Sequence, residues 1–138
     1  MLRLLPATRR SIETHAVETY PQECCGFLIG AAGPVRLAHR IHRLTNTCPP
    51  SPHPRYEADP REWLWVERSL AHAEEIIGIY HSHPDCPPLP SKADCADASA
   101  GLSYVIVSVY RGRILGMRSW QLSVERAVFD EEELEVAA

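Results

Sequence analysis

The segment GIYHSHPDCPPLPSKAD, residues 78–94, joins an apolar run to a group of polar side chains through a proline-rich loop. Its first part is typical of a buried strand, and this strand ends in His81 and His83. Residues two apart on a strand project from the same face, so the two imidazoles leave the strand in parallel. This spacing predicts that both histidines can bind one metal ion.

Asp94 is the candidate for a third ligand. The loop 84–90 contains four prolines, which restrict its conformations and would help to hold Asp94 opposite the histidines. A catalytic zinc takes three protein ligands and keeps one position for water. Two imidazoles and one carboxylate leave the centre positively charged, which lowers the pKa of a bound water toward ~7. We therefore expect Zn²⁺ at His81, His83 and Asp94.

Each of these signals also has a simpler interpretation. An HxH pattern often occurs by chance, and SKAD at 91–94 is an ordinary helix opening in which Ser91 caps the helix and Asp94 occupies position N3. The two interpretations are compatible, because a serine can cap a helix and still face a site. The combination of the HxH pattern with SKAD at short range, with Pro90 directly before the serine, favours the metal site.

The flanking sequence predicts a single sheet with helices packed against it, an α/β or α+β sandwich. Apolar runs of strand length recur along the chain, and proline or glycine separates them. The expected strands are 24–30, 35–44, 76–81, 103–110 and 113–122, with a short strand or turn near 124–129. The expected helices are 6–20, 60–74 and 91–100, with a proline-rich loop at 45–60 and a frayed acidic tail at 130–138.

Length and composition favour one domain, residues 1–138. The net charge of −4 comes largely from the acidic tail, and no block is basic enough to predict nucleic-acid binding. No apolar run approaches the ~20 residues of a membrane span, and the amino terminus does not resemble a signal peptide. Five cysteines without such a signal indicate reduced thiols, so we expect a cytoplasmic protein.

A carboxylate that transfers protons is also expected near a hydrolytic metal. Glu23 is the candidate, in the segment PQECCGFLIG at the junction of the first helix and the first strand. Glu23, HSH at 81–83, seven further residues and SKAD at 91–94 together resemble the motif of the JAMM (MPN-plus) metalloproteases. The resemblance covers roughly residues 23–110, and the chain length suits a small prokaryotic member.

The resemblance implies a JAMM/MPN sandwich, similar to that of cytidine deaminases, with zinc on His81, His83 and Asp94. It implies that Glu23 activates the zinc-bound water and passes the proton to the leaving amine, while Ser91 stabilises the oxyanion of the tetrahedral intermediate. Members of this family hydrolyse peptide or isopeptide bonds after the Gly-Gly terminus of ubiquitin-like proteins. Small prokaryotic members are associated with sulfur-carrier proteins of ubiquitin-like fold.

Three other functions compete with this interpretation. A zinc deaminase requires an HxE and a PCxxC signature, and the chain contains no CxxC. A non-catalytic MPN-fold interaction module stays an alternative, because intact ligand residues do not prove that metal binds. A thiol enzyme or redox sensor would have to use its cysteines. We expect Cys24 and Cys25 to be buried in the first strand and Cys86 to lie beside the site.

Overall fold

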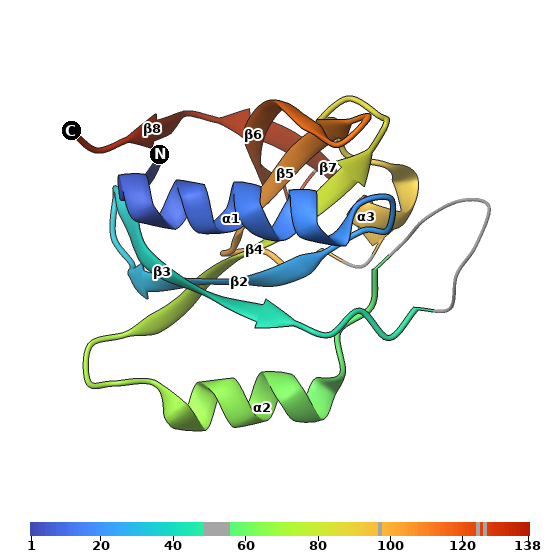
Figure 1. Ribbon diagram of the computed structural model, residues 1–138. Helices are drawn as coiled ribbons and strands as arrows, with labels where there is room; N and C mark the ends of the chain where they lie inside the picture. Colours follow the sequence, from blue (N-terminus) through green and yellow to red (C-terminus); the bar gives the residue numbers. More distant parts are fainter. Residues whose placement is uncertain (49–55, 97, 124, 126) are drawn as a thin grey trace.

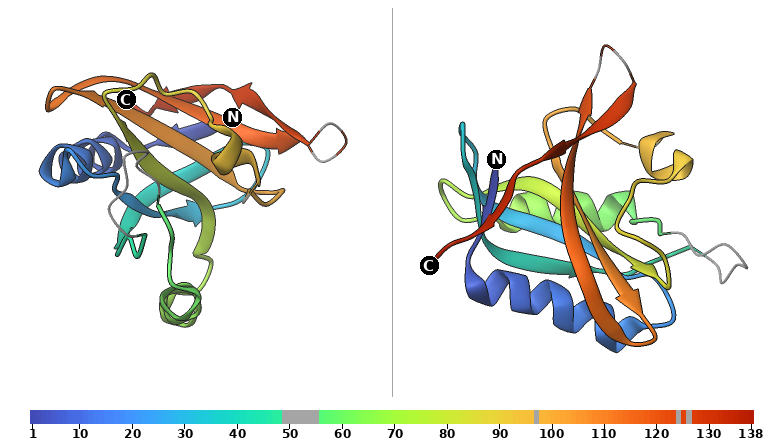
Figure 2. Two further views of the ribbon diagram at one scale, coloured as in Figure 1. Left: turned by 90° about the vertical axis from the view of Figure 1, so that its right-hand side faces the viewer. Right: turned by 90° about the horizontal axis from the view of Figure 1, so that it is seen from above.

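The computed structural model describes residues 1–48, 56–96, 98–123, 125 and 127–138. They form one mixed sheet with the strand order β7-β6-β5-β4-β2-β3-β1-β8 and a long helix on each face (Figure 1, Figure 2). This architecture confirms the predicted fold class. The helices are α1 (Pro6–Thr19), α2 (Pro60–Ser69) and α3 (Lys92–Ala96). The strands are β1 (Leu2–Leu4), β2 (Cys25–Ala31), β3 (Arg36–Leu44), β4 (Glu75–Pro84), β5 (Ser103–Tyr110), β6 (Arg113–Ser123), β7 (Val128–Glu132) and β8 (Leu134–Val136).

β4 lies in the middle of the sheet and carries both histidines. It pairs antiparallel with β2 and parallel with β5, so that His81 lies between Cys25 and Ile106. The strand continues to Pro84, beyond its predicted end at residue 81, and it pairs with β5 as far as Pro84. This extension keeps His83 within the strand and therefore on the same face as His81.

The two faces of the sheet carry separate cores. α1 covers a core that includes Tyr80, and α2 covers a core that includes Phe27 and Ile79. Side chains alternate between the faces along a strand, so His81 and His83 lie on the same face as Ile79. The histidines therefore extend the α2 core toward one end of the sheet.

Two helices end earlier than the sequence predicts. α2 ends at Ser69 because Leu70, which continues its apolar stripe in sequence, adopts an extended conformation and packs into the core from the following turn. α3 ends at Ala96, and the chain then turns so that the Ser99 N–H donates to the Tyr104 hydroxyl. In the described part of the chain, no helix has the length and apolarity to cross a membrane.

The acidic tail is ordered, and the prediction that residues 130–138 are frayed is wrong. β7 pairs with β6 at one edge of the sheet, whereas β8 pairs in parallel with β1 at the other edge. Cations of the amino terminus compensate part of the charge: the Met1 ammonium lies 3.6 Å from Glu132, and Arg3 lies 3.2 Å from Glu135. The negative run is therefore stabilised by groups that are remote in sequence.

His15 of α1 is buried against β4, where its Nδ1 lies 2.7 Å from the Tyr80 hydroxyl oxygen. Burial, and then the positive charge of Arg43, lower the pKa of His15 from 6.5 to about 4, and Glu18 opposes them. Between pH 6.5 and about pH 4, the range bounded by these two pKa values, the native state binds fewer protons than the unfolded state. Its stability therefore falls as the pH drops through this window.

A His15→Gln variant isolates this effect. Each unit of pKa difference corresponds to about 1.4 kcal/mol, and part of the ring remains screened by solvent. Between pH 7 and pH 5 we expect the free energy of unfolding to fall by about 1–2 kcal/mol more in the native protein than in His15→Gln. Urea unfolding of both proteins at both pH values measures this difference. Equal losses would show that protonation of His15 is not coupled to folding.

Candidate active site

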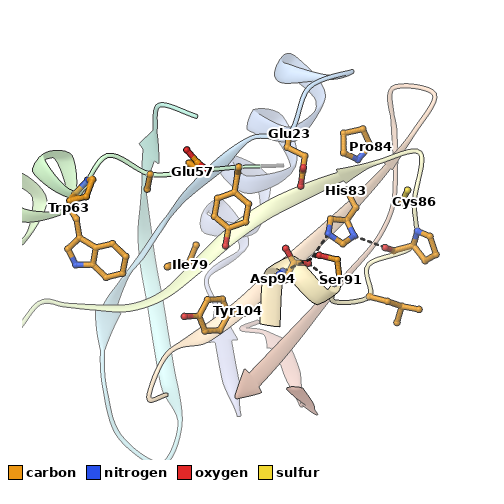
Figure 3. A pocket seen from close by; sticks show the side chains of 15 residues that line it. Glu23, Glu57, Trp63, Ile79, His83, Pro84, Cys86, Ser91, Asp94 and Tyr104 are labelled. Atoms are coloured by element: carbon orange, nitrogen blue, oxygen red, sulfur yellow. Dashed lines mark hydrogen bonds and ion pairs between the residues drawn. The ribbon is translucent and has the colours of Figure 1, made fainter. Parts of the chain in front are cut away.

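A cleft of about 760 Å³ opens on the α2 face of the sheet, at the carboxyl end of β4 (Figure 3). Its walls come from Glu23, which lies two residues before β2, the segment 56–60 with α2, strands β4 and β5, and the loop 84–91 with α3. Parts of the chain that are far apart in sequence therefore meet at one opening. The close view places the polar group His83, Ser91 and Asp94 between an apolar wall with Trp63 and Tyr104 and a rim with Cys86.

The three predicted metal ligands converge on one point. The Nε2 atoms of His81 and His83 are 3.0 Å apart, and each lies 3.3 Å from a carboxylate oxygen of Asp94. Zinc bonds of about 2.0–2.1 Å in a tetrahedral arrangement separate neighbouring ligand atoms by roughly 3.3 Å. The spacing of the donor atoms thus fits a single ion of this size, and nitrogen with carboxylate oxygen is a donor set that suits zinc.

A hydrogen bond fixes the orientation of His83, whereas the buried Nδ1 of His81 has no partner among the described residues. The Nδ1 of His83 lies 2.9 Å from the Pro87 carbonyl oxygen, which can only accept, so Nδ1 carries a proton, and in the neutral ring the lone pair of Nε2 faces the site. Burial lowers the pKa of His81 and outweighs the opposing effect of Asp94, which favours the neutral imidazole that a metal requires. Burial would raise the pKa of Asp94, but its contacts with both histidines outweigh burial and hold it well below its usual range.

The proline-rich loop before α3 is held through its carbonyl groups. Ser108 donates to the Cys86 carbonyl, and the Trp120 indole N–H donates to the Pro88 carbonyl at 3.2 Å. Together with the contact of His83 to Pro87, these bonds hold three consecutive carbonyls from one side. They place α3, and therefore Asp94, opposite the histidines.

Ser91 and Asp94 form the reciprocal cap that the sequence also allows. The Ser91 N–H donates to a carboxylate oxygen of Asp94 at 2.8 Å, and the Asp94 N–H donates to the Ser91 Oγ at 3.1 Å. The cap uses Ser91 Oγ as an acceptor, so its hydroxyl hydrogen can be donated toward the cleft. Capping and a position in the site are therefore combined in one residue.

Glu23 reaches the same site from the direction of β2, the strand that pairs with β4. It precedes β2, is only 4% exposed, and has a carboxylate oxygen within 4.8 Å of ligand nitrogens of both His81 and His83. Its Oε2 is buried and has no hydrogen-bond partner among the described residues. Burial, with Asp94 acting in the same direction and His83 against it, raises the pKa of Glu23 to about 7.

Two carboxylates can therefore compete for the place of the third ligand. Asp94 lies closer to both imidazole Nε2 atoms, and its oxygens point at them. Glu23 is farther away, and its unpartnered buried oxygen suits a group that exchanges a proton rather than one that completes the metal coordination. Asp94 therefore stays the candidate for the third ligand, as expected from the sequence.

Tyr56 is a site residue that the sequence does not reveal. Its ring stacks on His81 with ring centroids 4.4 Å apart and an interplanar angle of 27°, and it lines the cleft. Tyr56 follows a proline-rich stretch without periodicity, so no local pattern marks it. Only the pairing of distant segments brings its ring over the histidine.

Two of the five cysteines lack the character of a catalytic thiol. Cys24 and Cys25 are buried, as predicted, and burial raises the pKa of their thiols to about 11 and about 12. A thiol with such a pKa is almost entirely protonated near neutral pH and is a poor nucleophile. Cys86 is exposed and lines the cleft, as expected from its place in the loop.

Two characterised relatives align with most of the chain. A desampylase of Haloferax volcanii is 35% identical over 113 residues, which cover 78% of this chain and 80% of the relative. A CysO-cysteine peptidase of Mycobacterium tuberculosis is 33% identical over 119 residues, which cover 85% of this chain and 79% of the relative. Their names describe hydrolases, which supports a hydrolase here as well.

Solved structures and a family model agree with the fold. A protein from Desulfitobacterium hafniense matches with a TM-score of 0.84 and 29% identity over 99% of this chain and 93% of its own. A structure described as a JAMM metalloprotease-like zinc site has a TM-score of 0.61 and 16% identity over 100% of this chain and 99% of its own, which shows the shared fold. A model of prokaryotic homologues of the JAB domain matches residues 6–123. The chain therefore belongs to the family of prokaryotic JAB-domain homologues.

Proposed function

We propose that this protein is a zinc-dependent metallopeptidase that hydrolyses the bond after the C-terminal Gly-Gly of a ubiquitin-like or sulfur-carrier protein. The observation that carries the proposal is the convergence of His81, His83 and Asp94 at 3.0–3.3 Å beside a buried carboxylate. The likeness to the solved JAMM zinc site supports zinc as the ion. A non-catalytic module would have no need for this arrangement.

The relatives support the class of substrate. The names desampylase and CysO-cysteine peptidase describe removal of a ubiquitin-like or sulfur-carrier protein from its adduct. A Gly-Gly terminus suits such a cleft, because a chain without side chains can approach the floor of the cleft and present its carbonyl group there. The leaving group is the amine beyond this carbonyl.

The residues of the site then have distinct roles. Zinc, when bound by His81, His83 and Asp94, would polarise the scissile carbonyl and lower the pKa of a water molecule. Glu23 accepts a proton from the attacking water and passes it to the leaving amine. The Ser91 hydroxyl donates a hydrogen bond to the oxyanion, and removing one such donor typically costs about 3 kcal/mol of transition-state stabilisation.

A fusion protein tests the function directly. A ubiquitin-like domain that ends in Gly-Gly is fused to a short peptide, and the products are analysed by mass spectrometry after incubation with the zinc-loaded protein. We expect cleavage directly after the second glycine. The same fusion with Ala-Ala in place of Gly-Gly should remain intact. No cleavage of either fusion by protein that contains zinc would contradict the proposed function.

Chelation and thiol alkylation separate the metal model from a thiol model. We expect a chelator to abolish cleavage and added zinc to restore it, because the ion would be an essential part of the site. Iodoacetamide should leave most of the activity of a Cys86→Ser variant, which lacks the exposed thiol of the cleft, since the two most buried thiols have raised pKa values. Complete inactivation by iodoacetamide with zinc still bound would favour a thiol enzyme.

A further inference from the structure

The side chain of Asn46, the single asparagine of the chain, joins three backbone segments at the cleft. Its Nδ2 donates to the Glu23 carbonyl oxygen at 3.1 Å. Its Oδ1 accepts from the N–H groups of Cys48 and Glu57, both at 3.0 Å. Chemistry fixes the orientation of this amide, because two N–H donors require an oxygen and a carbonyl requires an N–H group.

Asn46 continues the pairing of two strands beyond their last backbone contact. β2 and β3 pair up to Cys25 and Leu44. Glu23 and Asn46 each lie two residues beyond this pair, outside the backbone ladder. The amide of Asn46 supplies the donor that a further backbone N–H would have supplied. The Glu23 carbonyl is thus held as if the sheet continued.

The position of the Glu23 carboxylate depends in part on its backbone. The buried Oε2 has no hydrogen-bond partner among the described residues, so no such bond fixes that oxygen independently of the main chain. On the next residue, the Cys24 N–H donates to Ser82 Oγ at 2.9 Å, and the Cys24 carbonyl accepts from the Ser82 N–H at 3.1 Å. Asn46 holds the Glu23 carbonyl itself. A shift of about 1 Å in a reacting group can cost about 100-fold in rate.

The same amide holds the segment that carries Tyr56. Glu57 donates its N–H to Asn46, and its carbonyl accepts from the Thr47 N–H at 3.0 Å. The residue before it, Tyr56, stacks on His81. The base of this segment is therefore tied to the same side chain as the Glu23 backbone.

We propose that Asn46 is a positioning residue that holds the Glu23 backbone and the Tyr56 segment in one fixed relation to His81 and His83. Its Nδ2 donates to the Glu23 carbonyl, and its Oδ1 accepts from the Glu57 N–H of the Tyr56 segment. This role rests on the function proposed above, because the position of Glu23 matters for rate only if Glu23 transfers the proton. The tie between the segments can be measured without any substrate.

Asn46→Asp separates the two halves of the amide. The carboxylate keeps an acceptor for Cys48 and Glu57, but it faces the Glu23 carbonyl with a charged oxygen instead of a donor. With the Gly-Gly fusion we expect kcat to fall about 10- to 100-fold and KM to change less than about threefold, with zinc content unchanged. Asn46→Ala also removes the acceptor, so the amides of Cys48 and Glu57 should exchange hydrogen about tenfold faster, as measured by NMR.

Gln121→Glu is the matched control. Gln121 of β6 donates to Glu132 of β7 at 2.8 Å, so the same exchange of an amide for a carboxylate costs stability outside the cleft. Its kcat should stay within about twofold of the native value. A comparable loss of kcat in this control, or a native kcat in Asn46→Asp, would overturn the proposal.

Failure of the proposed function is distinguishable from failure of this inference. If the native protein binds zinc but cleaves no fusion, the proposed function fails, and the exchange rates alone decide the role of Asn46. Faster exchange of the Cys48 and Glu57 amides in Asn46→Ala then supports the tie between the segments. Unchanged exchange overturns it.

Discussion

Replacing Glu23 by glutamine is expected to leave zinc bound and to lower kcat by about 10²- to 10⁴-fold, the usual contribution of general acid–base catalysis. Glutamine has nearly the same shape and fits the buried position, but its amide cannot accept a proton from water or pass it to the leaving amine. Steady-state kinetics on the Gly-Gly fusion measures the loss of turnover. Elemental analysis of the same sample measures zinc.

Glu18→Gln is the matched control for this change. Glu18 is an exposed residue of α1 that pairs with Arg43 at 2.7 Å, so the same exchange of a carboxylate for an amide leaves the cleft untouched. Its turnover should equal that of the native protein. Full activity of Glu23→Gln would remove Glu23 from proton transfer, whereas loss of zinc from it would make Glu23 the third ligand.

Asp94→Ala is expected to release the metal and, with it, all measurable cleavage. Structural zinc sites bind with an apparent free energy of about 10–16 kcal/mol over four ligands, so loss of one ligand should weaken binding by about 10²- to 10³-fold. Competition with a chromophoric chelator measures the affinity. Retention of one zinc per chain after such competition would contradict the assignment of Asp94.

Ser91→Ala separates metal binding from helix capping. Asp94→Ala removes both a candidate ligand and the acceptor for the Ser91 N–H, so an altered α3 would also explain a loss of zinc. Ser91→Ala removes the other half of the same cap, the bond from the Asp94 N–H to Oγ, and leaves all three ligands in place. It should therefore keep zinc. If both variants lose zinc equally, capping rather than ligation explains the result.

The candidate metal ligands can be recognised in the sequence because they are close together in it. Strand geometry alone places His81 and His83 on one face, and the prolines limit where Asp94 can lie. The structure brings these atoms together. Glu23 is less accessible to such reasoning, because its approach to the histidines depends on the pairing of β2 with β4. The resemblance to a family, rather than the local pattern, makes it a candidate.

Residues whose position depends on pairing between distant segments cannot be predicted from local sequence patterns. Asn46 and Tyr56 lie at the two ends of a proline-rich stretch, and neither belongs to a periodic pattern. The order of the acidic tail was also missed, since its strands depend on partners at opposite edges of the sheet. Composition indicates whether a segment tends to be disordered by itself. Pairing with other strands can still order such a segment.

The proline-rich loop at residues 84–90 limits how a peptide can bind along the rim of the cleft. Pro87, Pro88 and Pro90 have no N–H group, and the Leu89 N–H already donates to the Pro87 carbonyl at 2.8 Å. An incoming chain therefore finds no free main-chain donor along residues 87–90 and cannot be added there as an extra β-strand. Selectivity for the part of a peptide that lies along residues 87–90 therefore depends on the shape and polarity of side chains. A single substitution can change these without disturbing the sheet.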